Sequence, residues 1–406
     1  MIHVASLDGD GYPERPMEAN GSDLHPAQIA LAQKFCSVWL LGPPPGPAVE
    51  RLVAHLFPAE EAELALQLPM YLQRPAAAVA RRLGRDPAEV EAGLSRMAER
   101  STIFGGRKGY TLLPLVPGQF EYLLMGGGGD DWYRTYAELF EEVFGSGYAS
   151  AYTRAHVPVV RTVPATGVSA SGASSREITI EQPVDSRGKV VDDDAMLAML
   201  QAHERFGVLN VCQCRQSRHL TGHRCRVAAP ADGCLILGAF ASSSVEKGKG
   251  RLVTRDEVCD IIDRRRGQRL VFLAGNVAPE SPNVICTCCE CCCHALQLVN
   301  EWGGQQWLAP PRFLLAMDES RCDHCGLCRP ACGTHAHEVK RKVHTFHPER
   351  CIGCGICVDA CPQGALMLEP NRGYRRPARS FTHLGARVAP SAGLALLRAR
   401  GVRRRD

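Results

Sequence analysis

Cysteine is distributed very unevenly along this chain, and that distribution limits the possible folds more than any other feature. Of the 20 cysteines, only Cys36 lies before residue 212, and the other 19 lie between Cys212 and Cys361. The first 20 residues are acidic, and they lack the basic start and apolar run of a secretory signal, so we expect a cytoplasmic protein. Thiols in that compartment rarely form structural disulfides, and a dense group of them indicates metal or cluster ligation.

Length and composition predict several soluble domains. A chain of 406 residues is too long for one compact core. Hydrophobic residues make up 45% and charged residues 22%, which is typical of globular proteins. No run of about 18 apolar residues occurs, so we expect no transmembrane helix. The sequence therefore predicts an α+β multidomain protein.

Changes in composition along the chain divide it into five parts. We expect a poorly ordered N-terminus (1–45), an α+β region (46–200), a Cys-rich α/β middle domain (201–310), a ferredoxin-like domain (311–370) and an Arg-rich tail (371–406). Within the α+β region, the pattern predicts a helix, a turn, a second helix and a hairpin over about residues 66–116. That order is typical of a winged helix, so we expect a winged-helix-like unit there.

The second helix of this unit, PAEVEAGLSRMAER, is the one that would meet DNA in a winged helix. It carries Glu89, Glu91 and Glu99 against Arg96 and Arg100. Its carboxylates would be repelled by phosphates, so nucleic-acid binding is disfavoured and a packing or partner-docking role is expected.

One cysteine motif occurs twice near the C-terminal end of the Cys-rich stretch. Residues 317–332 read MDESRCDHCGLCRPAC and residues 346–361 read FHPERCIGCGICVDAC, so both copies carry C-x2-C-x2-C-x3-C. In this spacing three thiolates bind one [4Fe–4S] cluster, and the fourth binds the cluster of the other copy. We expect cluster I on Cys322, Cys325, Cys328 and Cys361, and cluster II on Cys351, Cys354, Cys357 and Cys332. Zinc sites usually use separated C-x2-C pairs, so this spacing favours clusters.

The repeat resembles the bacterial two-[4Fe–4S] ferredoxin family. The segment CIGCGICVDACPQGAL matches the family pattern throughout, whereas the first copy departs from it. Gly333 stands where proline is usual, and His335 and His337 replace a glycine and an apolar residue. All four sulfurs of the first copy are retained, so the departures bear on the packing and potential of cluster II.

Ten further cysteines precede the repeat in two segments, CQCRQSRHLTGHRCRVAAPADGCLILG (212–238) and CTCCECCC (286–293). One possible four-ligand set is Cys212, Cys214, Cys225 and Cys234. The second segment adds Cys286, Cys288, Cys289, Cys291, Cys292 and Cys293, which are more ligands than one cluster uses. Adjacent residues of an extended chain point to opposite sides, so we expect some of these thiols to face the core or a different cluster.

These segments resemble a family of larger ferredoxin-type proteins. The shared features are C-x-C-R…G-x2-C…C-L, then GRLVTRDEV, then VICTCCECCC, in that order over roughly residues 40–370. Thr287 and Glu290 stand where the family has asparagine and glycine. The resemblance implies electron transfer and at least one extra metal centre. A third [4Fe–4S] cluster is favoured over zinc, and free or redox-active thiols are the remaining alternative.

The Arg-rich tail is strongly basic. Residues 372–405 hold ten arginines, and Asp406 is the only acid that follows. We expect it either to be a solvated end or to dock an acidic redox partner. The apolar residues in PSAGLALLRARG also allow peripheral membrane association.

Together, these patterns predict an iron–sulfur electron-transfer protein that passes single electrons to a larger oxidoreductase. A carrier or redox subunit is favoured over a stand-alone enzyme. The alternatives are a redox-sensing regulator with a winged helix and an oxidoreductase acting at the extra cluster. No P-loop and no dinucleotide fingerprint after a strand occurs, so we expect no nucleotide cofactor.

Overall fold

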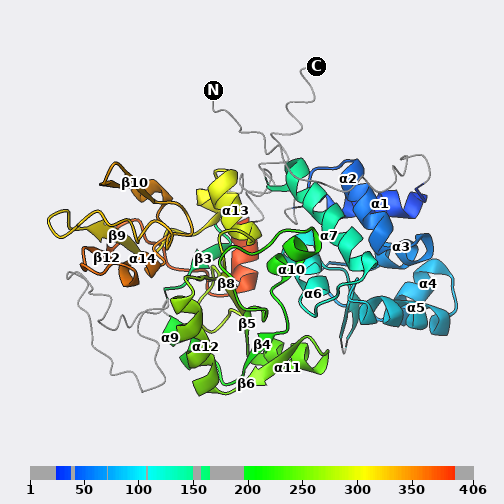
Figure 1. Cartoon of the computed structure of the whole chain (residues 1–406). Coiled ribbons are helices and arrows are strands. Elements are labelled where there is room, and N and C mark those ends of the chain that lie inside the picture. The colour runs from blue at the N-terminus through cyan, green and yellow to red at the C-terminus, as the bar shows by residue number, and fades with distance from the viewer. Residues whose placement is uncertain are drawn as a thin grey trace.

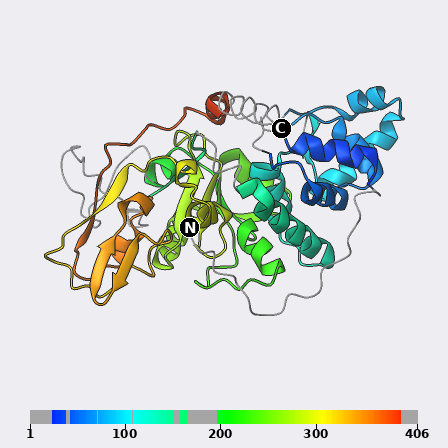
Figure 2. The same ribbon diagram turned by 90° about the horizontal axis from the view of Figure 1, so that it is seen from above.

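The protein has three adjoining parts arranged in a row, as the computed structural model shows. It describes residues 24–37, 42–70, 72–106, 108–149, 157–164 and 196–388. A helical part lies at one end, a six-stranded sheet with its helices in the middle, and the repeated cysteine motif at the other end (Figure 1). The view from above shows the same order, with the helical part and the motif-bearing part on opposite sides of the sheet (Figure 2).

The helical part is built from short amphipathic helices. They are α1 (Pro26–Phe35), α2 (Pro47–Leu56), α3 (Ala59–Leu66), α4 (Ala76–Leu83), α5 (Pro87–Glu99), α6 (Phe120–Leu124) and α7 (Asp131–Val143). The expectation of a poorly ordered segment over residues 1–45 is wrong for α1. Leu31 and Phe35 are almost completely buried against α2 and α3, and this apolar burial stabilises the helix.

Helices α4 and α5 and the hairpin after them occur where the sequence predicts them. The Asp86 side chain caps α5 by accepting hydrogen bonds from the amides of Ala88 and Glu89. Strands β1 (Phe104–Gly106) and β2 (Gly109–Thr111) pair antiparallel. The order of helix, helix and hairpin is thus confirmed, and the winged-helix-like identity of the unit stays a prediction.

The middle part is an antiparallel sheet in the strand order β3-β7-β8-β5-β4-β6. Its strands are β3 (Val160–Thr162), β4 (Phe206–Leu209), β5 (Leu235–Leu237), β6 (Gly250–Val253), β7 (Val271–Gly275) and β8 (Val284–Cys288). The helices are α9 (Met196–Gln201), α10 (Gln213–Leu220), α11 (Gly238–Glu246), α12 (Arg255–Gly267) and α13 (His294–Glu301). Strand β3 and helix α9 come from the region expected to end at residue 200, so the sheet domain begins earlier in the chain than expected.

The two faces of this sheet pack against different elements. On one face, Phe272 of β7 and Ile285 of β8 pack against α9 and α12. The alternate residues of the same strands face the other way, and Leu273 and Cys288 join the core formed with the helical part and α13. Because side chains alternate along a strand, Cys286 and Cys288 of β8 share this second face.

The motif-bearing part contains two small two-stranded antiparallel sheets. Strand β9 (Phe313–Met317) pairs antiparallel with β12 (Leu366–Pro370), and β10 (His337–Lys340) pairs with β11 (Val343–Phe346). The short helices in and before this part are η4 (Gln305–Trp307), η5 (Pro348–Arg350) and α14 (Ile356–Asp359). Arg266 of α12 donates from Nε to Asp359 Oδ2 at 2.6 Å, which ties this part to the middle sheet.

The start of the Arg-rich tail packs on the middle part. Ala378 forms a parallel bridge with Val277, and Leu384, in a helical stretch at 381–388, is buried beside them. The expected tail over 371–406 is therefore part of the fold as far as residue 388, and residues 389–406 lie outside the described residues. No described helix has the length and apolar character needed to cross a bilayer.

Candidate metal centres

The four cysteines assigned to cluster I line one cavity. Cys322, Cys325 and Cys328 come from the loop after β9, and Cys361 follows α14. Cys328 is buried, and burial, together with the charges of neighbouring thiols, raises the pKa of its thiol to about 11. A cluster bound here would displace that proton, because thiolates are the ligands of iron.

The cysteines assigned to cluster II also interact with one another. Burial raises the pKa of Cys354 to about 12, and the charge of Cys332 adds to the shift. Cys332 also raises the pKa values of Cys351 and Cys357, after the larger effect of burial. The amide of Ala336 donates to Cys332 Sγ at 3.2 Å, and such N–H donors stabilise cluster sulfur. Cys332 of the first copy thus interacts electrostatically with three cysteines of the second copy.

A pair of buried histidines lies beside cluster I. His344 of β11 places Nδ1 3.6 Å from Cys322 Sγ and Nε2 3.6 Å from Cys328 Sγ. His337 Nδ1 lies 2.8 Å from His344 Nε2, and burial followed by the His344 charge lowers the pKa of His337 to about 4. Both contacts are hydrogen bonds when Nδ1 of His337 donates to Nε2 of His344 and Nδ1 of His344 donates to Sγ of Cys322. The cysteine spacing gives no signal for His344, because the β10–β11 hairpin brings it to the sulfurs.

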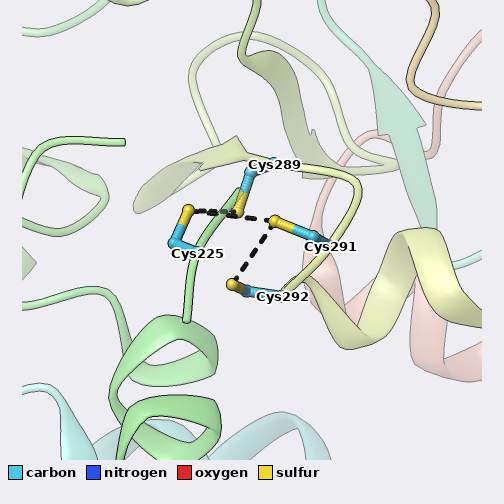
Figure 3. Close-up of side chains that lie close together, drawn as sticks. All are labelled: Cys225, Cys289, Cys291 and Cys292. Carbon is cyan, nitrogen blue, oxygen red and sulfur yellow. Dashed lines mark hydrogen bonds between the residues drawn. The ribbon is translucent and has the colours of Figure 1, made fainter. Parts of the chain in front are cut away.

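A separate group of four cysteines, which we call the Cys quartet, has sulfurs that all lie within 4.8 Å of one another: Cys225, Cys289, Cys291 and Cys292. The sulfur of Cys225 lies 3.8 Å from those of Cys289 and Cys291, and the sulfurs of Cys291 and Cys292 are 3.7 Å apart (Figure 3). Four thiolates around one ion with bonds of about 2.3 Å would be about 3.8 Å apart, since a tetrahedron's edge is about 1.63 bond lengths. The Cys quartet therefore has the dimensions of a single-ion site.

The surroundings of the Cys quartet hold its loops in place. The amide of Arg226 donates to Cys291 Sγ at 3.3 Å, and the Arg226 side chain lies 3.3 Å from the Glu290 carboxylate. The other oxygen of Glu290 lies 3.6 Å from Nε2 of His335 in the motif-bearing part. Both oxygens of Glu290 thus have partners outside the Cys quartet.

The remaining six candidate cysteines form a second group, which we call the six-thiol ring. Each of its thiols interacts with two others, in the closed order Cys212, Cys214, Cys293, Cys288, Cys286, Cys234. The four-ligand set of Cys212, Cys214, Cys225 and Cys234 is not brought together, because Cys225 belongs to the Cys quartet. The ten candidate cysteines of the two segments therefore divide into groups of six and four.

Two arginines lie beside these sulfurs, of which Arg265 is buried and Arg215 is half-buried. Arg265 is 2% exposed, and its Nη2 lies 2.8 Å from Oδ1 of Asp232. Arg215 donates from Nη1 to the carbonyl of Thr287 at 3.0 Å and from Nη2 to the carbonyl of Asp232 at 2.8 Å. Although burial opposes it, the thiolates of Cys212 and Cys289 and their neighbours raise the pKa of Arg215. The positive charges of these two arginines therefore favour the thiolate form of the neighbouring cysteines.

Comparison with known proteins identifies one segment. The model of a 4Fe-4S binding domain matches residues 344–367, which contain the second copy of the cysteine motif. No curated protein and no solved structure matches the chain. The chain thus contains a 4Fe-4S binding domain near its C-terminus, and no family is assigned to its full length.

Proposed function

We propose that this protein is an iron–sulfur electron carrier with two crossed [4Fe–4S] clusters, I and II, and at least one additional metal centre. The observation that carries the proposal is the position of Cys332, which belongs to the first copy of the motif and interacts with the cysteines of the matched 4Fe-4S segment. A [4Fe–4S] cluster, when bound, accepts and releases single electrons.

The burial of the ligands gives the electron path a direction. Cys325 is exposed, and its neighbour Leu327 is 46% exposed, so cluster I would lie near the surface. Cys354 of cluster II packs against the main core, together with Ile352 and Ile356. Because crossed ligation keeps the clusters close, an electron that enters at cluster I would pass inward to cluster II.

The additional centre of this proposal is a single tetrahedral ion in the Cys quartet. The sulfur separations of 3.7 and 3.8 Å favour a mononuclear site, with zinc as the expected ion, over the third [4Fe–4S] cluster expected from the sequence. Its role would be structural, since it links the loop after α10 to the loop after β8.

We further propose that the carrier docks an acidic redox partner, to which it delivers electrons. Arg372, Arg375, Arg376, Arg379 and Arg387 are exposed on the packed part of the tail. The basic residues of the α4–α5 unit are less available, since Arg85 pairs with Glu89 and Arg100 pairs with Glu61. This distribution supports a docking role for the Arg-rich segment, and it favours packing over DNA binding for the α4–α5 unit.

The decisive experiment compares Cys332→Ala with Cys36→Ala in anaerobically purified protein. Cys332→Ala should lose up to about four irons, the content of one cube. EPR of the reduced variant should lose the magnetic interaction between two clusters while the signal of cluster I remains. Cys36 lies outside every sulfur group, so its variant should match the parent protein. A colourless protein with zinc in the two crossed sets would contradict the proposal.

A further inference from the structure

The six-thiol ring is assembled by the sheet and by the ends of two helices. Cys286 and Cys288 share one face of β8, and the register Leu235↔Ile285 places Cys234 directly opposite Cys286. Cys212 and Cys293 stand at the N-caps of α10 and α13. Four of the six side chains are at least 94% buried, because Cys212, Cys234, Cys288 and Cys293 are exposed by only 6, 1, 6 and 4%. The ring is therefore part of the folded interior.

The spacing within the six-thiol ring differs from that of the Cys quartet. In the described part of the chain, the Cys quartet is a group whose sulfurs all lie within 4.8 Å of one another, and the six ring sulfurs supply no such group of three. One zinc ion, or two zinc ions that share thiolates, needs at least three sulfurs in mutual contact. The ring therefore encloses more space than one ion fills.

Buried cysteines can also pack simply as small apolar side chains, but the charges beside this ring argue against that alternative. Arg215 and Arg265 are both held beside Asp232, and the hydrogen bonds of Arg215 go to backbone carbonyls. The Asp232 carboxylate pairs with Arg265, and among the described residues no carboxylate is paired with Arg215. A buried charge without a counter-charge costs several kcal/mol, and six neutral thiols would not supply one. Thiolates bound to an inorganic cluster would supply that counter-charge.

The helix termini reinforce this negative environment. α10 and α13 are each eight residues long, and each begins immediately after a ring cysteine. The first amides of a helix lack partners inside it and favour an anion at that end. Two such termini converge on the same ring of thiols.

From these observations we infer that the six-thiol ring binds a polynuclear iron–sulfur cluster of four or more irons, separate from clusters I and II and from the ion of the Cys quartet. Cys288 and Cys293 of the ring belong to the same apolar core as Cys354 of cluster II. A cluster in the ring would extend the proposed electron path from cluster II into the middle domain.

The test is a count of iron, acid-labile sulfide and zinc in the full chain after anaerobic reconstitution. Clusters I and II account for about eight irons, and a ring cluster raises the total to about twelve or more, a 1.5-fold increase. Replacing two opposite members of the ring, Cys212→Ala with Cys288→Ala, should return the iron to about eight and leave the EPR signals of clusters I and II. Cys259→Ala, on α12 and outside all sulfur groups, is the matched control and should keep the full count.

Several results would overturn the inference. They are a parent protein with about eight irons, a ring variant with undiminished iron, and two or more zinc ions beyond the one of the Cys quartet. If the ring variant does not fold, the parent protein still decides the question, because about twelve irons together with one zinc leave only the ring for the third cluster. Clusters I and II are tested separately through Cys332→Ala, so failure of the proposed carrier function and failure of the ring site give different results.

Discussion

The single-ion assignment of the Cys quartet predicts that its cysteines contribute unequally to stability. Cys225 is separated from Cys289 by 64 residues, whereas its other partners follow β8 closely. A metal bound by all four closes this long loop. Cys225→Ala removes one ligand and opens the loop, whereas Cys292→Ala removes one ligand and leaves the loop closed.

The size of the difference follows from loop entropy. For a closed loop of about 64 residues, the chain-entropy relation gives about 14 cal/mol/K, or about 4 kcal/mol at 25 °C. Both variants lose one thiolate, so the ligand effect largely cancels between them. We expect the free energy of unfolding of Cys225→Ala to be lower than that of Cys292→Ala by up to about 4 kcal/mol, because the relation is an upper limit where the unfolded chain keeps structure.

The assay is urea unfolding of both variants and of the parent protein, with zinc measured in each sample. X-ray absorption of the bound metal should show sulfur at about 2.3 Å and no neighbouring metal. After removal of the metal with a chelator, the two variants should become equally stable. Equal stability before chelation, or a short metal–metal distance at this site, would refute the single-ion reasoning.

Four other predictions concern charge and protonation. His344→Leu removes a hydrogen bond to sulfur worth about 1 kcal/mol. Redox titration should therefore show that the reduction potential of cluster I falls by about 40 mV while that of cluster II stays unchanged. Equal shifts of both potentials would contradict the His344 contact. Glu141, which His294, Arg218 and Ser217 contact, has its pKa lowered to about 2 against the effect of its burial. Because the pKa of Glu141 is lower in the folded than in the unfolded state, Glu141 stabilises the protein by about 3 kcal/mol above pH 4.5, and this stabilisation is lost as the pH falls toward 2. Acid unfolding of Glu141→Gln should lack this loss. If the variant and the parent protein lose stability equally in acid, the contacts of Glu141 are unimportant. Arg375→Glu with Arg376→Glu should slow electron transfer to ferricyanide at low salt and not at high salt, and a salt-independent effect would exclude steering. Random duplex DNA should show no gel shift even at low salt, and a shift that salt abolishes would restore the regulator alternative.

Local spacing was enough to predict those features that depend on neighbouring residues. The motif spacing assigns the eight cysteines of the repeat to two crossed sets, because it determines where neighbouring thiolates lie. The structure brings Cys322, Cys325, Cys328 and Cys361 to one cavity, and the crossed ligation stays a prediction. The order of helix, turn, helix and hairpin over about residues 66–116 is likewise predicted from the sequence, since capping and periodicity act within a few residues. The helix α1 was missed because its burial depends on partners in α2 and α3.

The sequence alone established that ten cysteines before the repeat could bind metal, and only the tertiary structure divided them. Strand alternation and register bring Cys234, Cys286 and Cys288 to one face of the sheet, while the turn after β8 sends Cys289, Cys291 and Cys292 toward Cys225. Likewise, His344 reaches cluster I through the pairing of β10 with β11. The number of ligands is a property of the chain, whereas their grouping depends on contacts between residues far apart in sequence, which form only when the sheet and its helices pack.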